Sequence, residues 1–153
     1  MTVQAQILDL IRDLQREFNS SVVLITHDLG VVAELADDVL VMYAGRAMEY
    51  GSAEQLFNRP AHPYTWGLLG SIPRFDRSRR ERLLAIKGTP PSLIHVPPGC
   101  PFHPRCSYAG RNGGRSEEEL PELIPVEPGH TVACHLSRVE REQIWEHEIA
   151  RRL

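Results

Sequence analysis

The first residues of the chain place apolar side chains at the period of a helix. They recur at spacings of three and four and form one stripe: Val3, Ile7, Leu10, Ile11, Leu14 and Phe18. Thr2 suits the N-cap of this helix, and Asn19 and Ser20 suit its end. The pattern predicts an amphipathic helix of about four to five turns with one face that needs to be covered.

A continuous apolar run, residues 22–25, follows without alternation. Such a run is typical of a strand covered on both faces in a parallel sheet. Asp28 is predicted to cap a short helix that continues through Leu35. His27 therefore lies at the carboxyl end of a predicted strand, where open α/β sheets bind ligands. Its imidazole could donate to a phosphate or orient a water; a capping histidine at a turn is the alternative.

The next segments read as a hairpin and a helix. Residues 39–43 and 47–50 predict two strands joined by a turn at 44–46, and Gly51 closes the pair. Ser52 and Gln55 form a capping box that opens a further helix. This order predicts an α/β layered domain. We expect it to be incomplete on its N-terminal side, because so short a sheet cannot cover the first helix.

Composition separates two parts of the chain. All twelve prolines of the 153 residues lie at or after Pro60. With 42% hydrophobic residues a core is possible, and a net charge of −3 gives no basic excess that would indicate nucleic acid. No apolar run approaches the roughly 20 residues of a membrane-spanning helix. Three cysteines, without a secretion signal, indicate a reducing compartment and thiols that are free or bind a metal.

Two stretches carry a family resemblance. LITHDLGVVAELAD, followed by VMYAGRAMEYG, resembles the H-loop and following hairpin of an ABC-transporter ATPase subunit. TVQAQILDLIRDLQREF resembles the helix after the D-loop of the same family. The match covers residues 2–72 and is closest to subunits of oligopeptide and dipeptide importers. The HPYT tetrapeptide, residues 62–65, resembles the entry to their C-terminal extension, and Pro63 suits position N1 of a docking helix.

The resemblance implies a fold and a function. Residues 1–72 would be the C-terminal half of a P-loop NTPase-type (RecA-like) domain, and residues 73–153 a small irregular cysteine-containing extension and tail. His27 would be the switch histidine, which contacts the γ-phosphate of ATP and positions the attacking water. Implied cofactors are ATP and Mg²⁺. Implied partners are a second ATPase subunit, the transmembrane permease subunits and, indirectly, a peptide-binding protein, at the cytoplasmic face of the plasma membrane.

The sequence departs from the family at the nucleotide site. The phosphate loop GxxxxGK[ST], the signature loop and the Walker B acids are absent, and the only lysine, Lys87, lacks the required glycines before it. We therefore expect a C-terminal piece from a truncated gene or a late start codon, inactive as an ATPase by itself. If it does not assemble with an importer, it would be soluble in the cytoplasm.

The cysteines lie in the second part. Cys100 and Cys106 form a C-x5-C pair, and Cys134 follows at a distance. Thiolates in a loop with little core suit zinc or an iron–sulfur cluster. The importer subunits often have four cysteines here, some holding a [4Fe–4S] cluster, but the third position falls at Gly113. The alternatives are no stable metal, which ranks first, a three-cysteine site, or a substitute ligand from His103, His130 or His135.

Two charged segments complete the chain. Residues 74–82 lack an apolar period and predict a solvated linker, and residues 83–86 a short strand. Residues 137–153 predict a charged helix with loose periodicity, interpreted as a surface tail, with contact to a partner helix as the weaker alternative. Besides the importer ATPase, two hypotheses stay open: a non-enzymatic metal-binding or interaction module, and an inert gene remnant.

Overall fold

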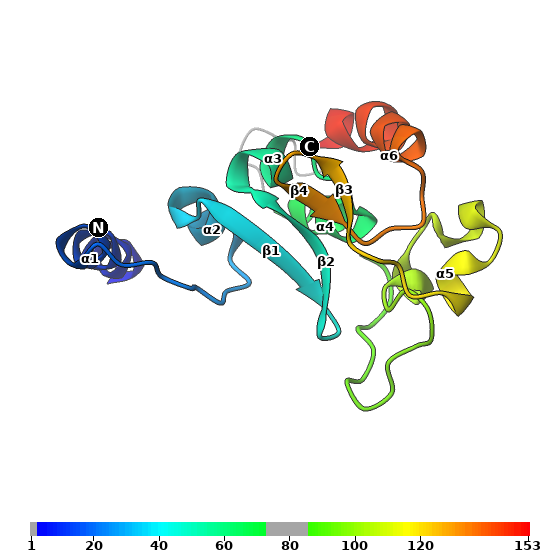
Figure 1. Cartoon of the computed structure of the whole chain (residues 1–153), viewed down its shortest axis with the longest axis horizontal. Coiled ribbons are helices and arrows are strands. Elements are labelled where there is room, and N and C mark those ends of the chain that lie inside the picture. The colour runs from blue at the N-terminus through cyan, green and yellow to red at the C-terminus, as the bar shows by residue number, and fades with distance from the viewer. Residues whose placement is uncertain (1–2, 73–85) are drawn as a thin grey trace, which may run out of the picture. The chain divides into compact units, whose positions relative to one another are not determined.

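The computed structural model describes residues 3–72 and 86–153 and contains two compact units, Met1–Asp37 and Asp38–Leu153. Thr2, the predicted linker at 74–82 and most of the predicted strand at 83–86 lie outside the described residues. Figure 1 shows the helices and strands of each unit. The predicted boundary between residues 72 and 73 refers to the family resemblance and stays a prediction.

The first unit contains two helices. Helix α1 spans Val3–Phe18, as predicted, and helix α2 spans Leu29–Leu35. Side chains tie the two together: Gln4 donates to Asp28, at 3.2 Å, and Arg12 donates to the Glu34 carbonyl, at 2.8 Å. These hydrogen bonds are exposed, so each contributes little to stability.

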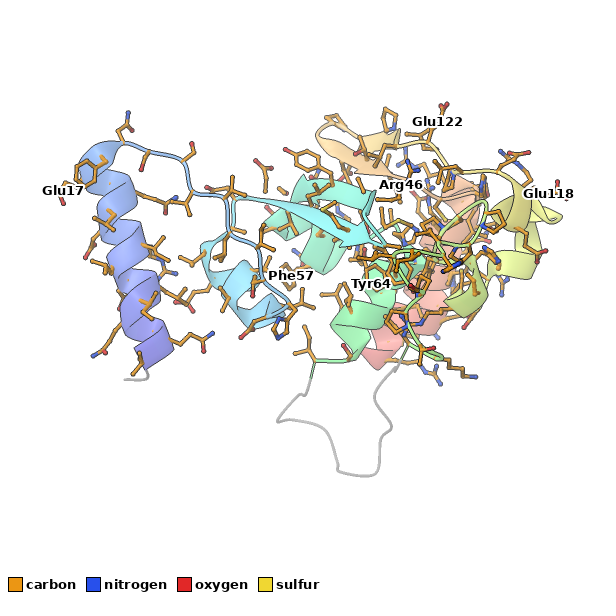
Figure 2. All side chains as sticks on the ribbon, turned by 90° about the horizontal axis from the view of Figure 1, so that it is seen from below. Glu17, Arg46, Phe57, Tyr64, Glu118 and Glu122 are labelled. Carbon is orange, nitrogen blue, oxygen red and sulfur yellow. The ribbon has the colours of Figure 1, made fainter. Side chains whose placement is uncertain are left out.

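The apolar stripe of α1 is not the face that this unit buries. Leu8, one position off the stripe, is buried, whereas Leu10 and Phe18 are 57% and 67% exposed. In Figure 2 the side chains of α1 stand away from the helix along its length, as far as Glu17 near its end. The stripe thus has the spacing of a helix, but the described residues leave most of it exposed.

The predicted strand at residues 22–25 is wrong. The structure has no strand there, and Val23 and Ile25 are 91% and 95% exposed. A parallel strand needs hydrogen-bonding neighbours, and the described residues offer it none. Residues 22–25 are therefore apolar in sequence but exposed in the described structure.

The second unit is built on a four-stranded antiparallel sheet. Strands β1 (Asp38–Tyr43) and β2 (Arg46–Ser52) form the predicted hairpin. Strands β3 (Ile124–Glu127) and β4 (His130–Val132) form a second hairpin, and β4 pairs with β2 in the sheet order β1-β2-β4-β3. The predicted extension is thus not irregular throughout, because it supplies half of this sheet.

Short helices connect and cover the strands. Helix α3 (Ala53–Asn58) begins at the predicted capping box of Ser52 and Gln55. Helix α4 (Pro63–Gly70) begins with Pro63 in its first turn, and the His62 ring accepts from the Tyr64 amide. The cysteine region holds the 3₁₀ turns η1 (His103–Arg105) and η2 (Ala109–Asn112) and the single-turn helix α5 (Arg115–Glu118).

Two apolar clusters form the core of the second unit. The first joins Tyr43 and Met48 of the hairpin to Cys100 and Phe102, and Tyr64 packs against it with ring centroids 4.8 Å from Tyr43. Figure 2 labels Tyr64 where side chains from several elements crowd together. The hairpin and the cysteine region therefore share one core.

The second cluster corrects the interpretation of the C-terminus as a surface tail. Trp66 packs with Leu136, Ile144 and Ile149, all nine-tenths or more buried. Helix α6 (Arg138–Ile144) passes into a π-helical turn, η3 (Trp145–Ile149), and a 3₁₀ turn, η4 (Ala150–Arg152). The π turn brings Ile144 and Ile149, five positions apart, onto one side, and this spacing does not follow the period of an α-helix.

In class, the described residues combine helices with an antiparallel sheet, consistent with α/β. None of the helices within residues 3–72 and 86–153 has the length and apolar character needed to cross a membrane.

Candidate functional site

His27 lies in a loop whose backbone is fixed by its neighbours. The Asp28 amide donates to the Thr26 hydroxyl, at 3.0 Å. The Asp28 carboxylate caps α2 by accepting from the amides of Gly30, at 2.9 Å, and Val31, at 3.3 Å. The Gln4 hydrogen bond, followed by these two amides, lowers the pKa of Asp28. The predicted cap is confirmed, and it holds the residue after His27 in one place.

The His27 ring itself is exposed. It follows a segment that is not a strand, so the argument from the carboxyl end of a strand does not hold for the described residues. What remains is a histidine directly before a capped helix. This local arrangement leaves the imidazole exposed to solvent.

The three cysteines are free thiols, and neighbouring thiols affect the pKa of Cys106 and of Cys134. Cys100 and Cys106 belong to or pack against the first apolar cluster, and Cys134 packs against the second. Burial first, and also the nearby thiols of Cys134 and Cys100, raises the pKa of Cys106 to about 12. Burial raises the pKa of Cys134 to about 11, against the effect of the nearby Arg141. All three side chains therefore favour the neutral thiol.

The candidate histidine substitutes each have another partner. A ring nitrogen of His103 lies 2.9 Å from the Cys100 carbonyl, and one of His135 lies 2.7 Å from the Glu119 carbonyl. His130 is 1% exposed and its Nε2 lies 2.7 Å from Glu49. Within the described ranges, no group of three or more His, Cys, Asp or Glu side chains is arranged to hold a metal ion.

A buried carboxylate, which the sequence did not indicate, organises the second unit. Glu49 is fully buried on β2 and accepts from the His62 amide, at 3.1 Å. It also accepts from the Ala61 amide and the Thr65 hydroxyl, and Nε2 of His130 donates to it, at 2.7 Å. One carboxylate thus joins the hairpin, the start of α4 and strand β4, as a buried charge must to offset its desolvation.

Comparison with known proteins identifies relatives of this chain. Residues 48–112 match the family described as oligopeptide/dipeptide transporter, C-terminal region. The chain is 59% identical over 137 residues to the oligopeptide transport ATP-binding protein OppD of Haemophilus influenzae, covering 90% of this chain and 41% of that relative. The predicted resemblance to peptide-importer ATP-binding subunits is confirmed.

Two further relatives agree. The oligopeptide transport ATP-binding protein OppD of Escherichia coli is 50% identical over 134 residues, which are 88% of this chain and 38% of that protein. The dipeptide transport ATP-binding protein DppD of Bacillus subtilis is 58% identical over 106 residues, which are 69% of this chain and 31% of that protein. The chain thus spans well under half the length of these ATP-binding proteins.

The residues present do not fit the [4Fe–4S] cluster implied by the resemblance to these ATP-binding subunits. The third cysteine position is Gly113, which has the left-handed backbone conformation with φ 66°. A Cβ at this position would meet no atom within 4 Å, so a side chain there would stand in open space. Such a cluster usually needs four thiolates, and this chain offers three protonated thiols.

Sequence reasoning singled out His27 and the cysteines as candidates, whose roles stay predictions, and missed the buried Glu49 and Arg141. A charged residue is expected at the surface, and no neighbour in sequence indicates that either of these two is buried. The one available signal was the apolar setting of Glu49 between Met48 and Tyr50 in a predicted strand.

Proposed function

We propose that this chain supplies the switch-histidine segment and the C-terminal extension of an ATP-binding subunit in a peptide importer. The observation that carries the proposal is the 59% identity to an oligopeptide transport ATP-binding protein across 90% of the chain. The capped loop at residues 26–28 supports it, because Asp28 fixes the backbone beside His27. Such a subunit would use ATP and Mg²⁺ to drive uptake of oligopeptides or dipeptides.

In such a subunit His27 would orient the reacting groups and would not provide the main binding affinity for the nucleotide. An exposed imidazole before a helix start can donate a hydrogen bond to a phosphate oxygen or orient a water. The phosphate loop and the Mg²⁺ ligands would have to come from residues outside this sequence, which lacks them. We therefore infer that the isolated chain neither hydrolyses ATP nor binds it tightly. Its RecA-like half-domain, second ATPase subunit and permease partners, at the cytoplasmic face of the membrane, belong to the same proposal.

A chimeric protein tests this directly. The matching 137 residues of the Haemophilus influenzae relative are replaced by those of this chain, and peptide-dependent ATP hydrolysis is measured with its importer. We expect activity within about tenfold of the parent, and a loss of about 100-fold or more in the His27→Ala chimera, since positioning groups commonly contribute this much. A correctly assembled but inactive chimera, or an unaffected His27→Ala chimera, would contradict the proposal.

Metal binding by Cys100, Cys106 and Cys134 is a second candidate function. The observation that favours it is the proximity of the three thiols, since Cys134 and Cys100 both act on the pKa of Cys106. Purification without oxygen, followed by analysis of iron, sulfide and zinc, tests it. Stoichiometric metal that is lost in Cys106→Ser would support a three-cysteine site. A metal-free protein with three titratable thiols would exclude it.

A further inference from the structure

A pocket of about 170 Å³ lies beside the second hairpin and α6, away from His27 in sequence. Two buried side chains, His130 and Arg141, contribute to its wall. Two exposed arginines, Arg59 and Arg138, line it together with carboxylates. One water needs only about 10–15 Å³ of such space, so the pocket has room for a small polar ligand.

The wall of the pocket contains an uncompensated cation. Arg141 is 3% exposed, and its Nε and Nη1 have no hydrogen-bond partner among the described residues. Arg141 lies near Cys134 and lowers the pKa of that thiol, but a thiol is only a weak acceptor. Because arginine stays charged and a buried charge without a partner is strongly unfavourable, this group favours a nearby anion.

His130 adds a second unpartnered atom to the same wall. Its Nε2 lies 2.7 Å from Glu49, an ionised acceptor that already receives three other donors, so Nε2 carries the proton. Nδ1 has no hydrogen-bond partner among the described residues, and lies 3.7 Å from Glu127. In the tautomer that donates from Nε2, Nδ1 is an acceptor, and His130 lines the same pocket as the Arg141 guanidinium, which presents donors.

The remaining charges of the pocket largely cancel. Arg59 pairs with Glu127 at 2.9 Å, and Arg138 pairs with Glu142 at 2.7 Å. Exposed pairs of this kind are weak, so either arginine can turn to another anion at little cost. Glu146 is the opposing charge, and its inward rotation onto Arg141 is the rival way to compensate the buried cation.

We propose that this pocket binds a phosphate group that keeps one proton, either as inorganic phosphate or as a phosphomonoester. Its oxygens accept from Arg141, and its hydroxyl donates to Nδ1 of His130. Arginine suits phosphate because its planar fork matches two oxygens. Sulfate has the same shape but carries no proton near neutral pH, so it satisfies the arginine and not the histidine. This inference does not rest on the importer function.

Thermal unfolding of the full chain tests the proposal, with phosphate, sulfate or chloride at equal ionic strength and neutral pH. A ligand that binds only the folded state raises the unfolding midpoint in a saturable way. We expect phosphate to raise it more than sulfate, and Arg141→Gln to abolish the difference. Arg115→Gln is the matched control, because it removes the same charge from an exposed pair with Glu119. Equal midpoints in phosphate and sulfate would overturn the proposal.

Two exposed positions keep the test valid if Arg141→Gln does not fold. Phosphorus NMR titration of the chain with inorganic phosphate and methyl phosphate gives both dissociation constants directly. We expect Glu146→Gln to tighten binding several-fold and Arg138→Gln to weaken it several-fold. Whichever phosphate binds more tightly identifies the source of the group. If both variants had the same dissociation constants as the unsubstituted chain, or if no saturable binding occurred, Glu146 or solvent would compensate Arg141 instead, and the proposal would be wrong.

Discussion

Residues 3–37 and 38–153 are both rich in apolar side chains but use them in opposite ways. The first unit buries Leu8 and Val31 and leaves the stripe of α1 and residues 22–25 largely exposed. The second unit closes two apolar clusters and also buries Glu49 fully. A motif can thus be held by a cap and a few exposed hydrogen bonds, whereas a fold needs sequence-distant contacts.

The largest expected effect is a difference in stability loss between two aromatic substitutions, one in each unit. Trp66→Ala empties the centre of the second cluster and should lower the free energy of unfolding by about 3–5 kcal/mol. Phe18→Ala, in the exposed stripe, should lower it by less than about 0.5 kcal/mol. Urea denaturation followed by circular dichroism measures both. Similar losses would mean that the stripe of α1 is buried in solution.

A substitution of the buried carboxylate sharpens the comparison with the exposed hydrogen bonds of the first unit. Glu49→Gln places an amide donor against groups that donate, and should cost about 3 kcal/mol. Glu117→Gln, at an exposed position, controls for the change in charge and should have almost no effect. The same denaturation experiment reads out both variants; a stable Glu49→Gln protein would show that the network is dispensable.

Acid should act on the second unit through His62. Burial lowers the pKa of this ring to about 4, from 6.5. The unfolded chain therefore binds the proton first, so stability falls as the pH drops from 6.5 to 4, by up to about 3 kcal/mol. Protonation also removes the acceptor for the Tyr64 amide at the start of α4. In His62→Asn, which keeps a capping side chain, the fall over this pH range should be smaller by that amount.

The smallest effect is expected within α1. Leu10→Gln changes an exposed position and should leave hydrogen exchange of the α1 amides nearly unchanged. Leu8→Ala removes the buried side chain of the same helix and should accelerate this exchange measurably. The reverse order would show that the stripe, and not Leu8, holds the helix in place.

Local signals made much of the fold predictable. The caps at Asp28 and Ser52, the proline at the start of α4, and the β1–β2 hairpin each depend on a few neighbouring residues. The failures depend on distant partners. Residues 22–25 have the composition of a central strand, but a strand forms only beside another.

The C-terminal half shows the same limit. Strands β3 and β4 are short, and Pro125 weakens the pattern of the first. Ile144 and Ile149 share a cluster through a π turn that an α-helical period does not anticipate. The partners of Glu49 lie up to 81 positions away in sequence, and the Nε and Nη1 of Arg141 have none among the described residues, so neither burial could be predicted from local composition.

Titration of the isolated chain with Mg²⁺ and ATP, followed by the NMR resonances of the His27 ring, tests the central claim most directly. We propose that His27 is the switch histidine of a peptide-importer ATPase and that the groups binding the nucleotide are not among the residues of this sequence. We expect no saturable shift of these resonances at millimolar ATP. We also expect His27→Ala, which lacks this ring, to show no saturable binding of ATP. A saturable, Mg²⁺-dependent shift at micromolar ATP would contradict the account.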